Sequence, residues 1–557
     1  LTDHWRRRAT ARVDGAPVYS VSSKLDTNAH TISGRARVLF TNVTGAALDE
    51  IVLRVYANSP VVDPGGSGAR VNRVTVDGRA VREKLQGSLL HVPLRGGLAP
   101  GAEALLALEF SESIPEISGG TGSIEQLLGR PGGGYGVFGY SGSVYDLGYF
   151  IPTVAGYGER GWEDREVPAL GDMSNFRCAY YNVSIDAPSD YVVAAPGVRD
   201  GGGSSRGRRT HRFRGGPLRD FTAQASPDYE VARSRVGRTA VSSYYLKGTP
   251  RGKDALRFAR QALEQYNDHF GRYPYVGLNV CEAPLGGGAG GMEFSGQIQI
   301  ARMLYGNPAG MLGVEGSPLE DLFESLGGGL LGDVLEFTVA HEVGHQWWGL
   351  AVGSDSIAHP WQDESLTNYC AVLYFRWAHG EEEARKQLQM QVALPYRAGR
   401  WLGGGDDLVV DTPADEFSSA SRFQAAVYSK GALFFEALEK LVGASAFERG
   451  LKKYYESYAF REAAPEDLVA SFSGGDAEAV AALHRRWILE THAEEDMAAD
   501  VPGADLLDMF DMLLKGLPGG PDMDSLRELL EELVPGGSPP WIPDGPHLDN
   551  REPVLPI

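Results

Sequence analysis

The hydrophobic pattern changes its period once along the 557-residue chain, near residue 235, and this change constrains the fold more than any other feature. Before it, polar and apolar residues alternate, which predicts strands with one buried face. The clearest runs are Tyr19–Leu25, Arg35–Phe40, Ile51–Tyr56 and Tyr181–Ile185. After it, apolar residues recur at helical spacing, first over Asp254–Phe270. The chain is therefore predicted to be a multidomain α+β protein with its β-rich part first.

The distribution of glycine, proline and charged residues indicates where loops and domain boundaries lie. The 72 glycines and 32 prolines predict many turns, with long loops at 119–139 and 201–207. Residues 493–557 carry 15 acidic side chains but only three basic ones, among Pro/Gly-rich linkers. We therefore expect three parts: a β-rich domain over 1–233, a second domain over 234–492 and an acidic extension over 493–557. Short helices are expected in the extension at 506–517 and 525–533.

Charge and cysteine content exclude several classes of partner and site. The net charge of −21 repels phosphate backbones, so a nucleic-acid partner is not expected. No apolar stretch reaches 18 residues, so no transmembrane segment is expected. Cys178, Cys281 and Cys370 are too few and too widely spaced for a disulfide framework or a thiolate zinc site. They are predicted to be buried free thiols.

One segment carries the chemistry, and it runs from Asp333 to Gly349 as DVLEFTVAHEVGHQWWG. A single helix is predicted here, with Asp333 and Glu336 as an N-cap and N3 pair and with Gly349 as the C-terminal stop. Histidines at 341 and 345 would then project from one face of the helix and could bind one cation. The intervening Glu342 would lie where it can take a proton from a water molecule bound to that cation.

A catalytic zinc site needs a third protein ligand and leaves one position for water. Glu364 lies 19 residues after His345, at the start of a second apolar-periodic segment that contains Leu366 and Leu373. The connection between the two segments is long enough to reverse direction. We therefore predict one Zn²⁺ per chain, held by His341, His345 and Glu364.

This spacing of HEVGH and Glu364 resembles the zinc signature of the gluzincin aminopeptidases, family M1 of the metallopeptidases, which includes alanyl aminopeptidase and leukotriene hydrolase. Two further motifs are similar. Gly290-Gly291-Met292-Glu293-Phe294 resembles the family's Gly-x-Met-Glu-Asn strand and is closer to the Gly-Gly-Met-Glu-Tyr variant of a bacterial branch. Tyr428-Ser-Lys-Gly resembles the family's Tyr-x-Lys-Gly.

The resemblance implies a fold, an activity and a set of roles. The fold would be an N-terminal β-sandwich-like domain followed by a thermolysin-like catalytic domain. Glu293, on a strand formed with Gly290, Gly291 and Met292, would bind the free α-amino group of a peptide. Tyr428 would donate a hydrogen bond to the oxyanion of the tetrahedral intermediate, and Glu342 would be the catalytic base. The expected reaction is the zinc-dependent hydrolysis of the N-terminal peptide bond.

Two alternatives stay open. Only 65 residues follow the apparent catalytic domain, whereas larger family members carry a long helical domain that closes the site. An open-cleft zinc endopeptidase is therefore one alternative, and a non-catalytic peptide-binding relative is the other. A homo-oligomer is also left open. The few cysteines and the absence of an initiating Met favour an exported bacterial-type enzyme over a cytoplasmic one.

Overall fold

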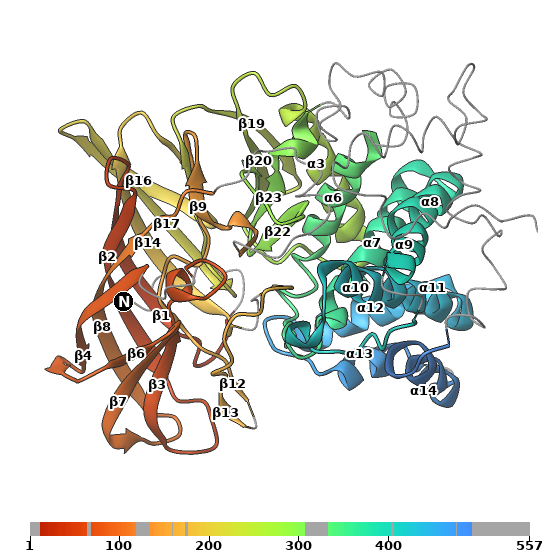
Figure 1. The fold of residues 1–557 in the computed structure, drawn as a ribbon, viewed down its shortest axis with the longest axis horizontal. Helices are drawn as coiled ribbons and strands as arrows, with labels where there is room; N and C mark the ends of the chain where they lie inside the picture. Colours follow the sequence, from red (N-terminus) through yellow and green to blue (C-terminus); the bar gives the residue numbers. More distant parts are fainter. Residues whose placement is uncertain are drawn as a thin grey trace, which may run out of the picture.

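The computed structural model describes residues 12–63, 68–117, 134–158, 160–172, 176–306, 332–402, 406–474 and 476–492. The predicted acidic extension, its two short helices and most of the predicted loop at 119–139 lie outside these residues. In Figure 1 the β-rich first part of the chain occupies the left of the molecule and the helices occupy the right. A small sheet lies between them.

An eight-stranded sheet dominates the first part, in the order β16-β17-β14-β1-β2-β8-β4-β5. Its strands alternate buried and accessible residues, as the period of two predicted. On β1, for example, Val21 and Leu25 are buried while Ser22 and Lys24 are exposed. The bounds are β1 Val18–Asp26, β2 Thr31–Thr41, β4 Ala69–Val76, β5 Arg79–Ala80, β8 Glu103–Ser113, β14 Ala179–Pro188, β16 Val198–Ser205 and β17 Arg208–Leu218.

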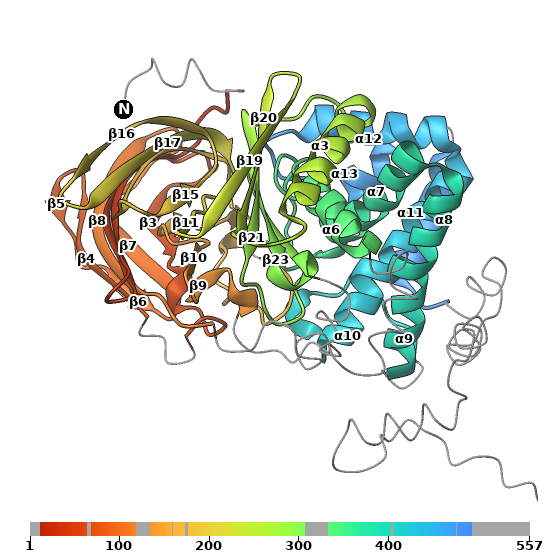
Figure 2. The same cartoon turned by 90° about the horizontal axis from the view of Figure 1, so that it is seen from above.

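Smaller sheets cover the inner face of this sheet, as the view from above shows (Figure 2). One has the order β15-β18-β10-β9 and another the order β11-β3-β7-β6, and a two-stranded ribbon joins β12 to β13. Their bounds are β3 Leu48–Arg54, β6 Lys84–Gln86, β7 Leu89–Leu98, β9 Phe138–Ser141, β10 Val144–Leu147, β11 Thr153–Val154, β12 Tyr157–Gly158, β13 Gly161–Trp162, β15 Val192–Ala194 and β18 Gln224–Ser226. The predicted sandwich-like β-domain is thus observed.

A five-stranded sheet of order β19-β20-β21-β23-β22 begins the second part. Its strands are β19 Tyr229–Val236, β20 Thr239–Leu246, β21 Gly277–Ala283, β22 Gly291–Phe294 and β23 Gln297–Ala301. Strand β19 spans the predicted boundary between 233 and 234, and that boundary stays a prediction. Helix α3 (Gly252–His269) packs on β19 and β20, and α6 (Gly332–Gly344) packs on β22 and β23. The sheet therefore supports the helices that carry the site.

The remaining helices form the right-hand part of Figure 1. The helices are α3 Gly252–His269, α6 Gly332–Gly344, α7 Trp361–His379, α8 Glu381–Gln387, α9 Leu394–Leu402, α10 Ala420–Phe423, α11 Gly431–Val442, α12 Ala444–Tyr458, α13 Pro465–Ser471 and α14 Ala477–His484. Short 3₁₀ turns lie at Tyr56–Asn58, Gly134–Gly136, Arg302–Tyr305 and Ala414–Glu416, and π-helical segments at Leu388–Ala393, Gln424–Lys430 and Arg485–Leu489. Among the described helices, none is long and apolar enough to cross a lipid bilayer. All three cysteines are buried free thiols, as predicted.

The loop predicted over 201–207 is wrong. Residues up to Ser205 belong to β16, which pairs with β17 through a register shift between Arg199 and Gly202. Gly202 has φ of +147°, and a Cβ there would lie 2.3 Å from the carbonyl oxygen of Thr210. The glycines therefore allow a bulged edge strand to approach its neighbour, which composition alone does not distinguish from a loop.

The predicted helix over 333–349 is shorter than expected. Helix α6 begins at Gly332, so Asp333 lies inside it and is not its N-cap, and it ends at Gly344. Glu336 instead accepts a hydrogen bond from the hydroxyl of Tyr374, and its carboxylate is hydrogen-bonded to Nε2 of His379. These two contacts join α6 to α7. The chain leaves the helix through turns up to Gly349, where φ is +90°. The connection then reverses and α7 begins at Trp361, close to the predicted start of the second helix.

Candidate active site

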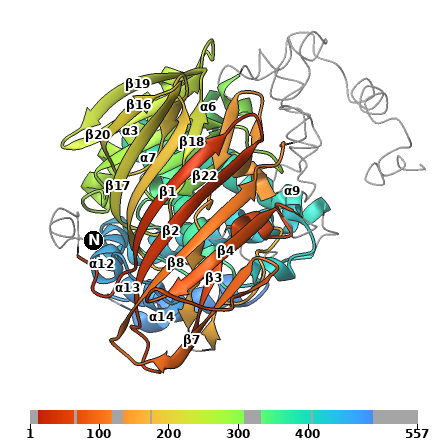
Figure 3. The same cartoon turned by 90° about the vertical axis from the view of Figure 1, so that its left-hand side faces the viewer.

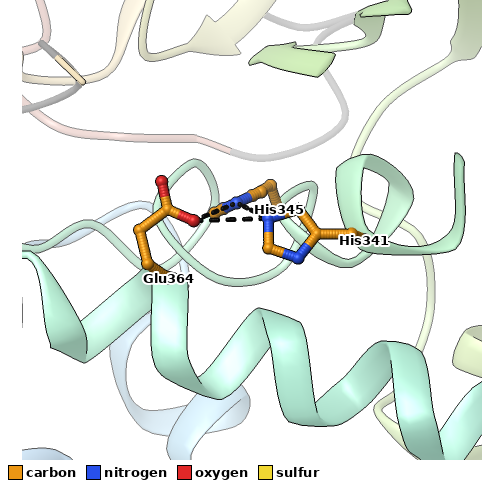
Figure 4. A group of neighbouring side chains, drawn as sticks. All are labelled: His341, His345 and Glu364. Atoms are coloured by element: carbon orange, nitrogen blue, oxygen red, sulfur yellow. Dashed lines mark hydrogen bonds and ion pairs between the residues drawn. The ribbon is translucent and has the colours of Figure 1, made fainter. Parts of the chain in front are cut away.

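Three side chains from α6, the turn after it and α7 converge at one point (Figure 4). The Nε2 atoms of His341 and His345 lie 3.0 Å apart. Each lies 3.2 Å from Oε2 of Glu364. All three residues are buried, at 7%, 1% and 4% exposure. Although α6 ends at Gly344, the amide of His345 still donates to the carbonyl of His341, so the helical spacing of the two imidazoles persists.

Hydrogen bonds orient these side chains. Nδ1 of His345 lies 3.1 Å from the carbonyl oxygen of Trp348, to which it donates, so the lone pair of Nε2 points toward the other two residues. Asp363 holds the connection in place, because its carboxylate accepts from the Ser354 hydroxyl and from the amide of Glu364. A Cβ at Gly349 would lie 3.1 Å from Asp363 Oδ2, so glycine permits this close return of the chain.

The three residues fit one zinc ion. Two neutral imidazoles and a carboxylate are the ligands of many catalytic zinc sites. Ligand atoms that each lie about 2.0–2.1 Å from a tetrahedral zinc are about 3.3 Å apart, and the observed separations are 3.0–3.2 Å. Among the described residues they are the one group of three or more His, Cys, Asp or Glu side chains with this proximity. We therefore take zinc to be the metal that this site accepts.

Glu342 lies beside the three residues and against strand β22. A Cβ at Gly291 would lie 2.3 Å from Oε1 of Glu342, so the strand backbone touches this carboxylate. The other oxygen, Oε2, is buried and has no hydrogen-bond partner among the described residues. Burial raises the pKa of Glu342 to about 8. The negative charge of Glu364 adds to this rise, and the positive charge of His345 opposes it. A buried carboxylate with an unpaired oxygen beside the three residues suits proton transfer.

Further buried carboxylates surround this point. Burial, with the charges of Glu364 and Glu342, raises the pKa of Glu293, which is 3% exposed on β22. Burial and the charges of Glu293 and Glu364 likewise raise the pKa of Asp172, which comes from the β-domain. At Glu364 burial opposes ionisation, but the neighbouring imidazoles of His345 and His341 outweigh it and lower the pKa. So many carboxylates can be ionised together only beside cations.

Tyr428 lies on a π-helical segment, Gln424–Lys430, between α10 and α11. Its ring centroid is 5.9 Å from that of His341, so the phenol faces the same space as the three residues. π-Helical turns often occur at functional sites. The segment is fixed by Lys430, whose ammonium donates to Asp407 at 2.9 Å and to the carbonyls of Leu408 and Glu490. Asn368 of α7 donates to the carbonyl of Tyr428 at 2.7 Å.

Comparison with known proteins assigns this site to a family. Residues 333–487 match the model of the peptidase family M1 domain. This segment of the chain is therefore similar to the M1 peptidase domain. The match contains α6, α7 and the Tyr428 segment, but not the Gly290–Phe294 strand, and assignment to the bacterial Gly-Gly-Met-Glu-Tyr branch stays a prediction.

This chain matches its curated relatives only over part of their length, 14–29% in those found most similar. Aminopeptidase M1-B of Oryza sativa subsp. japonica is 27% identical over 47% of this chain and 28% of its own length. Glutamyl aminopeptidase of Homo sapiens is 30% identical over 24% of this chain and 14% of its own. A crystal structure of a mutant M1 zinc metallopeptidase from Deinococcus radiodurans superposes with a TM-score of 0.58 at 20% identity, covering 88% of this chain and 96% of that one. The structural likeness shows the shared two-domain fold.

The structure brings the predicted residues together. His341, His345, Glu364, Glu342 and Tyr428 face one space. Strand β22 brings Gly291, Met292 and Glu293 to the edge of this space, and Gly290 directly precedes the strand.

One residue of this site, Asp172, carries no signal in the sequence. Asp172 interacts with the carboxylate of Glu364, and its backbone carbonyl accepts from the Ser356 hydroxyl. It lies in an irregular segment of the β-domain, far from every motif in the sequence. No spacing or periodicity singles it out, so only the three-dimensional fold shows it.

Proposed function

We propose that this chain is a zinc aminopeptidase that removes the first residue of a peptide. The observation that carries the proposal is the position of Glu342, whose buried Oε2 has no described partner beside the His341, His345 and Glu364 cluster. Bound zinc would polarise the scissile carbonyl and make an adjacent water more acidic. Glu342 would take the proton of that water and then give it to the leaving amine.

Two other residues support the proposal. Tyr428 faces the cluster and keeps its proton, because burial and the negative charges of Glu364 and Asp172 raise its pKa. It would donate to the carbonyl oxygen as negative charge develops there, which stabilises the transition state. Glu293 is a buried carboxylate, and the charges that act on it come from the carboxylates of Glu364, Glu342 and Asp363. The ammonium of a free peptide N-terminus would supply the opposite charge.

The relatives support the same reaction class. The matched plant and human proteins are named aminopeptidases, and one of the superposed Deinococcus radiodurans structures holds a Tyr-Ser-Ala substrate. That structure is similar over 85% of this chain at 19% identity. Peptides with a free N-terminus are accordingly the substrates that we assign to this chain.

The test uses paired peptides that differ only in N-terminal acetylation. Mass spectrometry of a digest should show free peptides shortened one residue at a time, while acetylated peptides stay intact. Internal cuts in both sets would instead identify an endopeptidase, and binding without any cut would identify a non-catalytic relative.

A matched variant tests the amine anchor itself. Glu293→Gln keeps the size of the side chain but removes its charge, so KM for free peptides should rise and the preference over acetylated peptides should shrink. An unchanged preference in this variant would contradict the role of Glu293.

A further inference from the structure

Four arginines surround a polar cavity on the outer face of the eight-stranded sheet. The cavity has a volume of about 440 Å³ and lies far from the His341 site in sequence and fold. Strands β17, β14, β1, β2 and β8 lie side by side at the front of Figure 3, where this sheet faces the viewer. The lining residues are Ser20, Val21, Ser22, Arg35, Arg37, Asn182, Ser184, Arg212 and Arg214.

Strand register arranges the arginines in two rows across four strands. In the first row, Ser20 of β1 pairs with Arg37 of β2 on one side and with Asn182 of β14 on the other. Asn182 in turn pairs with Arg214 of β17. Neighbouring strands lie about 4.8 Å apart, so each row places two long cationic side chains about 14 Å apart over a floor of short polar ones.

The second row repeats this arrangement two residues further along the strands. Ser22 pairs with Arg35 and with Ser184, and Ser184 pairs with Arg212. The hydroxyl of Ser184 also bonds the carbonyl of Val21. Residues two apart on a strand point to the same face, so both rows open onto the same cavity.

The positive charge of this cavity is only partly balanced. Arg35 pairs with Glu109 at 2.9 Å and Arg214 with Asp200 at 3.0 Å, and both carboxylates come from strands outside the two rows. Within the part of the chain that the structure describes, Arg37 and Arg212 have no carboxylate within ion-pair distance. Two guanidinium charges are therefore in excess, in a chain whose net charge is −21.

Two properties of these arginines point to an anionic ligand. Arg37 lies two residues from Arg35 on the same face of β2, and Arg212 lies likewise beside Arg214 on β17, so like charges repel along each side of the cavity. An oxyanion would relieve this repulsion. Guanidinium groups bind phosphate and sulfate oxygens through paired, charge-assisted hydrogen bonds. The hydroxyls of Ser20 and Ser22 and the amide of Asn182 add short donors on the floor.

We propose that this arginine cavity binds a phosphate or sulfate dianion, free or as the terminal group of a small organic molecule. The two excess guanidiniums match a charge of two. Binding of such an anion would occupy a surface of the β-domain and would not require peptide hydrolysis.

Isothermal titration calorimetry tests this inference. The zinc-loaded chain is titrated with inorganic phosphate, sulfate and glycerol 3-phosphate, and chloride keeps the ionic strength constant. One dianion per chain should bind. The Arg37→Gln/Arg212→Gln double variant should bind at least about tenfold more weakly, because each lost guanidinium removes charge-assisted hydrogen bonds. The control variant Arg95→Gln, which alters an exposed arginine on β7, should bind like the wild type.

The same titration can overturn the inference. If the double variant binds phosphate as well as the wild type does, the phosphate binds elsewhere, for example at the zinc. This result would refute the cavity as the binding site. The absence of saturable binding beyond that of chloride would refute it as well. Melting temperatures check that the variants are folded, and the single variants Arg37→Gln and Arg212→Gln provide the test if the double variant is not. Tighter binding of phosphate or of its monoester supports the inference and identifies the source of the dianion.

Discussion

Replacing Gly291 with Ala should slow the enzyme without removing its metal. A Cβ at this position would lie 2.3 Å from Oε1 and 2.6 Å from Cδ of Glu342. Ordinary carbon–oxygen contacts are about 1 Å longer. Because Glu342 is 5% exposed and packed on β22, its carboxylate must move by about that distance. A misplacement of about 1 Å in a catalytic group can cost about 10²-fold in rate, which corresponds to about 2.7 kcal/mol of transition-state stabilisation.

Gly290→Ala is the matched control, because its Cβ would lie 3.6 Å from Thr338 in ordinary contact. The assay is steady-state hydrolysis of a peptide substrate together with zinc content. We expect kcat to fall about 10²-fold in Gly291→Ala and to change little in Gly290→Ala, with one zinc per chain in both. A wild-type rate in Gly291→Ala would refute the inference that Glu342 acts from the position seen against β22.

Three further predictions concern other parts of the molecule. Tyr428→Phe should lower kcat about 10²- to 10³-fold and leave KM nearly unchanged, because it removes a donor to the developing oxyanion; a rise in KM alone would contradict this. Lys430→Met should destabilise the fold by about 3 kcal/mol in calorimetry, because it removes a buried ammonium that donates to Asp407 and to two backbone carbonyls, and adding Asp407→Asn should restore part of that loss. Burial and the charge of Arg199 lower the pKa of His211 to about 4. As the pH falls, this histidine is therefore protonated in the unfolded chain before it is protonated in the folded chain. The stability that is present above pH about 6.5 should be lost as the pH falls toward 4. The shift from about 6.5 to about 4 limits this loss to about 3 kcal/mol, and denaturant titrations should show it reduced in His211→Gln.

The sequence was sufficient to predict the site wherever local spacing determines the geometry. His341 and His345 share a helix face because they are four residues apart, and this holds even though α6 ends one residue before His345. Glu364 was predictable because it begins an apolar-periodic segment after a connection long enough to reverse. The two-part fold was likewise predictable from the change of hydrophobic period.

The sequence was insufficient where contacts between distant segments determine the structure. Asp172 contacts Glu364 from the β-domain, and no local sequence pattern predicts that contact. The predicted stop at Gly349 was wrong because the chain turns earlier to bring Gly349 against Asp363. The bulged pairing of Gly202 with β17 was missed because glycine-rich composition is shared by loops and edge strands.

The most direct test of the central claim measures zinc content and turnover together in Glu342→Gln. We expect one zinc per chain, because His341, His345 and Glu364 are unchanged. Turnover should be about 10²- to 10⁴-fold below that of the wild type, because the proton acceptor is lost. Near-wild-type turnover in a folded, zinc-loaded Glu342→Gln chain would contradict the proposed mechanism.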